Sequence, residues 1–484
     1  MRANDLQAPA GDQTAAPPSP PAPPGPPRIL KKFAYLLSAR WVREACQAAF
    51  FIYLARVSAA TFGEFMLALG LGSIILLVGE FGLNLPLVTQ LSRKDRSPGE
   101  ALSQVSLLKL ALLSLALLGV VGFVQWQGYA PALKRLVILL SLGTGLDALA
   151  NTFFVALQVQ GRQDLQGKVK ALAAALGFGY GLMALLLGAP PLMVAAFKLI
   201  ESLANIAGGT ALVLRWGLFR LQRPSLTGLG NTMRLGLVFA LIEVSAIIYN
   251  KANLFFLQKY AGAQGVAQYS VTWQMVDGIS SLVSNLLLQS ILYPLFVKLW
   301  QTDRSRVPQL AQNTARWLLL AALPVMFVLA LESDRLIPLV YGSQYQEAVL
   351  LQKYLVVTVA FAFLHNLAAF LMISMNRERL LLVFYFAGLV FNLAWCSLAI
   401  PRSPLVAAAL AMVLTKGLVA LCTVSYAQRR LGLFPVGSVK QLGAAVSAGA
   451  AIFLLGHNHL PREVAEALAL APLLVLAWYW WRNE

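Results

Sequence analysis

The chain has 484 residues, of which 58% are hydrophobic and 12% are charged. A soluble domain carries roughly 25% charged residues, so this composition excludes a soluble enzyme or a nucleic-acid-binding domain of this size. The formal net charge of +18 must first be considered against membrane topology, because basic loops orient membrane proteins.

Residues 1–30 are predicted to form a disordered cytoplasmic tail. Nine prolines and six alanines fall within the first 27 residues, and such a segment cannot bury enough apolar area to offset the entropy of ordering. No short apolar core of the kind found in signal peptides precedes Arg28. A solvated tail is favoured over a proline-rich ligand for a partner protein.

Fourteen apolar stretches then follow one another with short breaks. A helix of about 20 apolar residues can cross the hydrocarbon core, and a helix pairs its own backbone groups there. In chain order the predicted spans are 33–55, 64–87, 103–124, 136–158, 168–188, 191–214, 233–257, 268–297, 308–331, 346–371, 380–400, 404–427, 438–456 and 464–481. The predicted fold class is an all-α, polytopic membrane protein with about fourteen transmembrane helices.

The basic residues between the spans predict the orientation of the chain. With the N-terminus in the cytoplasm, the inner segments hold 22 lysines and arginines, and the outer loops hold 7. This ratio follows the positive-inside rule for a protein with both termini in the cytoplasm. The net charge is therefore mostly a signal of topology, and basic loops near anionic lipid explain it without nucleic acid.

Fifteen charged residues remain within the spans or at their edges. A charge at mid-bilayer costs about 2.5–3.5 kcal/mol on insertion scales, so we expect these residues to face one another or a water-filled cavity. Besides Lys109, the bases are candidates for substrate binding: Arg40, Arg43, Lys198, Arg234, Lys251, Arg316, Lys353 and Lys416. The acids are candidates for coupling transport to an ion: Glu44, Glu80, Asp147, Glu201, Glu243 and Asp277.

Helical spacing places several of these residues on shared faces, as in the first span, where Arg40, Arg43 and Glu44 lie at i, i+3 and i+4. We therefore expect a central hydrophilic cavity between the helices. The bases exceed the acids by three, which would make the cavity positive and suited to an anion such as a diphosphate. Two alternatives remain. Arg40 and Glu44 could form a structural pair, and four bases could snorkel to the membrane interface: Lys109, Arg234, Arg316 and Lys416.

The sequence lacks recognisable catalytic and metal-binding motifs. Its three cysteines lie in apolar stretches without a CxxC, and His457 and His459 fall in a predicted outer loop. His365, in the tenth span, is expected to be a hydrogen-bonded structural residue. No Gly-rich phosphate loop, nucleophile elbow or HExxH motif occurs, so we predict no enzyme activity, no metal and no cofactor.

Two similar regions, six spans apart, indicate an internal repeat. Residues 57–65 precede a span that ends near Pro86, and residues 259–274 precede one that ends near Pro294. An even offset gives both halves the same orientation, which is the layout of parallel-repeat transporters. We predict an N-lobe of residues 31–224, a C-lobe of residues 225–430 and two further spans within residues 431–484.

Three segments resemble the polysaccharide (O-antigen) flippase family of the multidrug/oligosaccharidyl-lipid/polysaccharide exporter superfamily. They are TFGEFMLALGLGSIILLVGEFGLNLPLVTQLSRK (61–94), YNKANLFFLQKYAGAQGVAQYSVTWQ (249–274) and DRLIPLVYGSQYQEAVLLQ (334–352). The resemblance extends from about Phe33 to the end of the chain. The family often ends its seventh span with a basic residue, any residue and an aspartate; this chain has Lys251, Ala252 and Asn253 there.

The resemblance implies an alternating-access flippase of the bacterial inner membrane. Such a protein would move an undecaprenyl-diphosphate-linked oligosaccharide between the leaflets for polysaccharide or O-antigen lipopolysaccharide synthesis, alongside a polysaccharide polymerase and glycosyltransferases. Its basic cavity would hold the diphosphate or acidic sugars, and its intramembrane acids could couple transport to protons or sodium. The alternatives are a drug/cation antiporter of the same superfamily, a peptidoglycan lipid II flippase and, less favoured, a membrane-embedded glycan polymerase.

Overall fold

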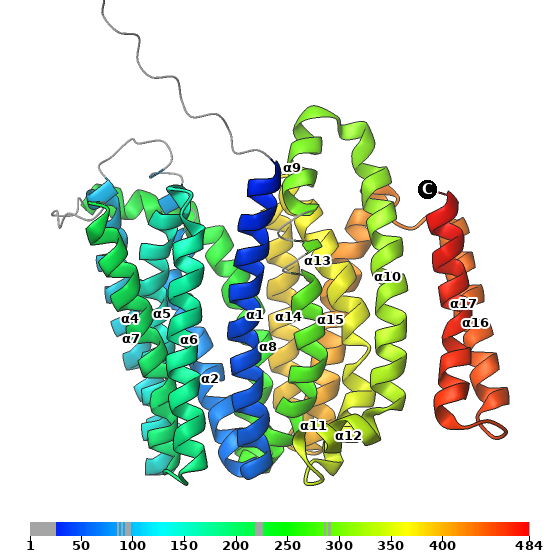
Figure 1. The fold of residues 1–484 in the computed structure, drawn as a ribbon, viewed down its shortest axis with the longest axis horizontal. Coiled ribbons are helices and arrows are strands. Elements are labelled where there is room, and N and C mark those ends of the chain that lie inside the picture. The colour runs from blue at the N-terminus through cyan, green and yellow to red at the C-terminus, as the bar shows by residue number, and fades with distance from the viewer. Residues whose placement is uncertain are drawn as a thin grey trace, which may run out of the picture.

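In a computed structural model of the protein, the described residues form a bundle of long helices that stand side by side (Figure 1). The structure describes residues 26–84, 87, 88, 91, 98–217, 226–284, 287, 288 and 292–483, and every regular element in these ranges is helical. The all-α fold predicted from the sequence is therefore confirmed.

The N-terminal half contributes six long helices. They are α1 (Pro26–Val57), α2 (Ala59–Glu80), α4 (Pro98–Trp126), α5 (Pro131–Val159), α6 (Gln163–Leu186) and α7 (Pro191–Arg215). Proline at the first position helps to set where α5 and α7 begin, because its fixed φ suits a helix and its missing N–H has no intrahelical partner there. At the start of α2 the Ser58 hydroxyl accepts a hydrogen bond from the backbone N–H of Thr61.

The C-terminal half begins with the 58-residue α8 (Leu226–Val283), in which Gly262 has a φ of 64° and interrupts the helical backbone. This positive φ suits glycine, and it divides the element between the seventh and eighth predicted spans. The elements that follow are α9 (Tyr293–Thr302), η2 (Arg304–Arg306), α10 (Val307–Leu331), α11 (Ser333–Tyr341), α12 (Gln346–Leu355), α13 (Thr358–Ser374), α14 (Glu378–Ala399), α15 (Pro404–Leu431), α16 (Val436–Gly456) and α17 (Arg462–Asn483).

Eleven helices among the described residues are long and apolar enough to cross a membrane, and α12 with α13, bent by 40°, would make a twelfth span. The protein is thus a multi-pass membrane protein. This number treats α8 as one span and leaves out α1, whose centre carries Arg40, Arg43 and Glu44. The exact number of fourteen stays a prediction.

The described chain begins and ends at the same end of the bundle, where α1 starts and α17 stops (Figure 1). Helix α1 begins at Pro26, within the segment predicted to be a tail, and residues 1–25 lie outside the described residues. That both termini face the cytoplasm remains a prediction.

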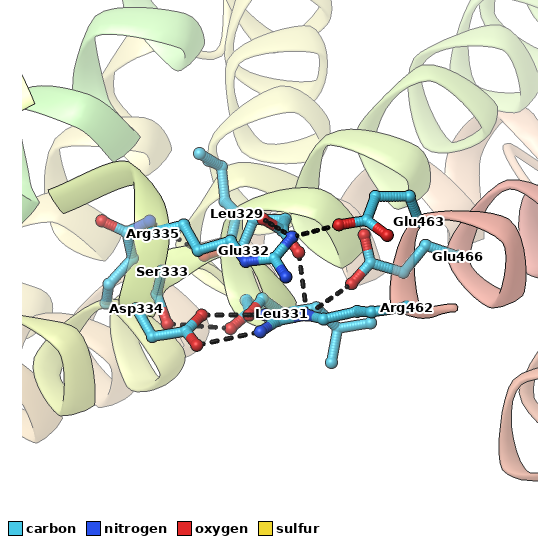
Figure 2. A network of polar contacts seen from close by, with 11 residues as sticks. Leu329, Leu331, Glu332, Ser333, Asp334, Arg335, Arg462, Glu463 and Glu466 are labelled. Atoms are coloured by element: carbon cyan, nitrogen blue, oxygen red, sulfur yellow. Dashed lines mark hydrogen bonds and ion pairs between the residues drawn. The ribbon is translucent and has the colours of Figure 1, made fainter. Parts of the chain in front are cut away.

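Helices α16 and α17 form a hairpin at one edge of the bundle (Figure 1). A small apolar cluster, which includes Leu320 of α10 and Trp480 of α17, packs the hairpin against α10. Figure 2 shows a second attachment, at the end opposite the termini, where Arg462 reaches Asp334 through two hydrogen bonds of 2.8 and 2.9 Å. In the same network the Arg335 guanidinium donates to Glu463 at 2.7 Å.

Candidate functional site

A central cavity of about 790 Å³ lies between the N-terminal helices and α8. Its volume is in the range of small-molecule binding sites, ~300–1,000 Å³. Polar and charged side chains from α1, α2, α5, α7 and α8 line it, among them Arg43, Glu44, Gln47, Ser73, Thr144, Asp147, Lys198, Glu201, Asn250, Lys251 and Asp277.

Four of these side chains form a compact ion cluster, which we call the α7 cluster: Arg43, Asp147, Lys198 and Glu201. The Lys198 ammonium donates to Asp147 at 2.6 Å and to Glu201 at 2.7 Å, and the Arg43 guanidinium donates to Glu201 at 3.3 Å. The Lys198 and Glu201 side chains are 8% and 1% exposed, so each charge needs a close partner to offset its lost hydration. The cluster joins α1, α5 and α7 and is formally neutral.

On the opposite wall, Lys251 and Asp277 of α8 border both the central cavity and a second cavity. Asp277 forms an ion pair of 3.4 Å with Lys416 of α15, and the Lys416 ammonium lies 4.4 Å from the centroid of the Trp273 ring. Within the described residues the Lys251 ammonium has no hydrogen bond and no ion pair. Lys251 is therefore a cation that an incoming anion can reach without displacing a carboxylate.

The second cavity, of about 390 Å³, lies among α8, α13, α14 and α15. His365 is held there by Tyr385 at 2.7 Å and by Thr423 at 3.1 Å, as expected for a hydrogen-bonded structural histidine. Asn366 donates to Ser284 at 2.5 Å. Aromatic rings and short polar side chains therefore face the same space.

The two halves contact each other directly at the end opposite the termini, beyond the α2 residues that line the central cavity. Helix α2 crosses α8 so closely at Gly63 that a Cβ there would lie 1.9 Å from the carbonyl oxygen of Ala263. The residues of α2 that line the cavity, from Met66 to Leu76, all follow Gly63.

A set of hydrogen bonds, which we call the α1–α11 latch, joins the same ends of the two halves. Arg56 donates to the carbonyl oxygens of Leu339 and Val340, the latter at 2.8 Å. In return Gln344 and Tyr345 donate to the carbonyl oxygen of Ala55, at 2.6 and 2.8 Å. Side chains of each half thus satisfy the C-terminal carbonyl groups of a helix from the other half.

The structure brings most of the predicted site residues together. The central cavity is lined by Arg43, Glu44, Asp147, Lys198, Glu201, Lys251 and Asp277, and the second cavity also by Lys416. The side chains of Arg40 and Arg234 lie outside the described residues.

Four of the predicted site residues line neither cavity, and each has another environment. Arg316 stacks over Trp480, with 5.3 Å between the guanidinium carbon and the ring centroid, at the contact of α10 with α17. Lys353 is exposed just before the bend between α12 and α13. Glu80 accepts a hydrogen bond of 2.6 Å from Asn151, and Glu243 is exposed on α8.

The described residues of the cavity do not by themselves show the expected excess of bases. Among the described residues, three bases and four acids line the central cavity and the second cavity adds Lys416, so these eight charges are balanced. The prediction counted every charge in the spans, and Arg316 and Lys353 lie elsewhere; because the side chains of Arg40 and Arg234 lie outside the described residues, the net charge of the cavity stays a prediction. Lys109 also lies elsewhere: its ammonium is buried against Asn84 and the carbonyl oxygen of Ala148.

Sequence reasoning missed several residues of the site. Asn366, Tyr249 and Tyr385 line the second cavity, yet a single polar or aromatic residue in an apolar span gives no charge signal. Lys170, which is not among the charged residues assigned to the spans, lies in α6 and donates to Asn151 at 3.2 Å. The Asn253 amide is buried and donates to the Tyr269 hydroxyl and to the carbonyl oxygen of Ala408, so its contacts are structural.

No group of three or more His, Cys, Asp or Glu side chains that could hold a metal ion occurs in the described part of the chain.

This arrangement, two groups of helices around a charged cavity, is a fold that the protein shares with solved flippases and multidrug transporters. The structure matches "Lipid II flippase MurJ, inward closed conformation" with a TM-score of 0.73, at 12% identity over 93% of this chain and 99% of that one. It matches the inward-facing conformation of a multidrug resistance MATE family transporter of the MOP superfamily with a TM-score of 0.65, at 14% identity over 81% and 94%. At these identities the likeness shows the fold alone.

The sequence comparison gives the family. The pattern of the family described as "Polysaccharide biosynthesis protein" matches residues 53–350, more than half of the chain. The chain belongs to this family. The "Probable low-salt glycan biosynthesis flippase Agl15" of Haloferax volcanii is 23% identical over 296 residues, which span 60% of each protein. The proteins that this chain resembles are flippases and transporters rather than enzymes.

Proposed function

We propose that the protein is an alternating-access flippase that moves a polyprenyl-diphosphate-linked oligosaccharide across a membrane for polysaccharide synthesis. In a bacterium the carrier would be undecaprenyl diphosphate, the membrane the inner one, and glycosyltransferases and a polysaccharide polymerase would act on either side of this step. The observation that carries the proposal is Lys251, which has no ion pair within the described residues and lines a large cavity of a polysaccharide biosynthesis family member.

The mechanism follows from the charges that line the cavity. A diphosphate needs compensating charge once it leaves water, and Lys251 offers an ammonium that forms no ion pair with a carboxylate of the described chain. Arg43 is the next base available, since its ion pair with Glu201 is long at 3.3 Å. The lipid tail would stay in the bilayer while two lobes, residues 31–224 and 225–430, rock about the site, with the spans in 431–484 attached.

The test is flipping in proteoliposomes that contain a lipid-linked oligosaccharide with a radioactive terminal sugar. A membrane-impermeant glycosidase would release the label only from the outer leaflet. Replacing Lys251 with glutamine should lower the rate at least tenfold, while arginine should preserve it. Lys353→Gln is the matched control, because Lys353 is exposed away from both cavities. Equal rates for Lys251→Gln and the wild type would reject the proposal.

Ion coupling is part of the proposal. Asp147, Glu201 and Asp277 are acids that line the cavity within ion-pair distance of a base, so a proton or sodium ion that binds one of them would release its cation. Flipping should then accelerate in an imposed proton or sodium gradient. Flipping rates that do not change in either gradient would exclude ion coupling.

Drug or cation antiport is the second candidate, because the four acids and three bases that line the central cavity among the described residues also suit a cation. Export of a fluorescent cationic dye from the same proteoliposomes, without flipping of the lipid, would favour it.

A further inference from the structure

The second cavity has the chemistry of a sugar-binding site. Tyr249, Phe361 and Tyr385 supply aromatic rings, and Asn250, Ser284 and Asn366 supply amide and hydroxyl groups. A hexose ring has the complementary character, with C–H groups on its faces and hydroxyl groups around its edge. Aromatic rings can pack on the faces, while amides donate to and accept from the hydroxyls.

Part of the polar lining is unsatisfied by the protein itself. The buried Oδ1 of Asn250 has no hydrogen-bond partner among the described residues, although its Nδ2 donates to the carbonyl oxygen of Ala246. The Nδ2 of Asn366 donates to the Ser284 hydroxyl, and its Oδ1 forms no hydrogen bond with the described chain. A buried acceptor without a partner, such as the Asn250 Oδ1, is costly, so a ligand with hydroxyl donors would be stabilised here.

The position of Lys251 connects this cavity with the diphosphate site. Lys251 borders both cavities, together with Asn250 and Asp277. A diphosphate bound at Lys251 therefore has the second cavity next to it. The volume of about 390 Å³ falls within the range of small-ligand sites.

We propose that the second cavity binds the sugar that is joined directly to the diphosphate. This inference rests on the proposed function and adds a subsite that selects the first sugar of the glycan. Aromatic packing on α13 and α14 and hydrogen bonds from α8 and α13 hold the ring, while Lys251 holds the adjoining phosphate.

The experiment compares the binding of short-chain prenyl diphosphate, alone or carrying one glucose, galactose or N-acetylglucosamine, to the purified full-length protein. At least one of the three sugars should raise the affinity about tenfold or more over the sugar-free compound. Phe361→Leu and Asn366→Leu should each reduce this advantage about tenfold and leave the affinity for the sugar-free compound unchanged, since each removes about one good contact. Phe386→Leu is the matched control, because Phe386 is 58% exposed on α14 outside the cavity.

The outcomes separate the two proposals. If no sugar improves binding, or if both cavity variants keep the full advantage, the subsite is refuted while the flippase proposal stands. If Lys251→Gln leaves binding of every compound unchanged, the proposed function itself is refuted. Two cavity variants are used because Asn366 also bonds Ser284, whereas Phe361→Leu changes only an apolar ring.

Discussion

The α1–α11 latch should control the equilibrium between the two openings of the cavity. In the present structure Arg56 and Tyr345 join the two halves at the end opposite the termini. Opening the cavity at this end must break these bonds, because they connect the helices that would separate. The perturbation is the double variant Arg56→Ala, Tyr345→Phe.

The hydrogen bonds of the latch determine how far the double variant shifts the equilibrium. Hydrogen bonds contribute ~0.5–1.5 kcal/mol each, and those to charged groups ~1.5–3. Arg56 is exposed, so its share is reduced to about 1 kcal/mol, and the buried Tyr345 hydroxyl adds about 1 kcal/mol. A total of about 2 kcal/mol corresponds to a shift of about 30-fold toward the state that is open at this end.

Spin labels at Leu187 and Glu347, in a chain without the three native cysteines, can measure the separation of the two halves. Both residues are exposed near the latch end. The double variant should enlarge the long-distance population, whereas Arg402→Ala, which removes an exposed arginine from the loop between α14 and α15, should not. Identical distance distributions for the wild type and the double variant would show that the latch does not hold the two halves together.

Three further outcomes are expected. Gly63→Ala should hinder closure of α2 on α8 and increase labelling of the cavity from the latch end, whereas Gly122→Ala, with nothing within 4 Å, should have no effect. Lys198→Met should lower the free energy of unfolding of the purified protein by about 3–5 kcal/mol, because Asp147 loses its ion-pair partner and the buried Glu201 keeps only the longer pair with Arg43; neutralising both acids as well should restore stability without restoring flipping. Hydrogen bonds from Arg462 lower the pKa of Asp334 to about 2. The interaction of Arg462 with the ionised Asp334 therefore stabilises the attachment of α17 fully above about pH 4, and this stabilisation is lost as the pH falls toward 2. A spin label at the start of α17 should gain mobility over that pH window. The same label in an Arg462→Gln variant should show no such change.

Sequence reasoning succeeded where a single helix carries the signal. The spacing of Lys198 and Glu201 places both on one face of α7, and the cost of charge in a membrane predicts that this face looks into a cavity. Both residues do line the central cavity. The same argument located Arg43 and Asp277 correctly.

Prediction from the sequence failed where the position of a charged side chain depends on a partner far along the chain. Lys198 finds Asp147 on α5, 51 residues away, and nothing in the local pattern specifies that pairing. Arg316 stacks over Trp480 of α17 and does not line the cavity. Lys353, just before the bend between α12 and α13, also lies outside the cavities. The sequence did not predict this position, because hydropathy alone does not reveal a bend.

The balance of charge in the cavity changes which base should matter most. An anion at Arg43 has to compete with Glu201, whereas an anion at Lys251 displaces no carboxylate of the described chain. A charge-assisted hydrogen bond is worth ~1.5–3 kcal/mol, so Lys251→Gln should weaken diphosphate binding by about 10- to 100-fold. Arg43→Gln should weaken diphosphate binding less, because Arg43 already pairs with Glu201 and only part of its charge is available to the ligand. Equal losses for the two variants, measured with short-chain prenyl diphosphate, would mean that the ion pairs of the α7 cluster open before the ligand binds.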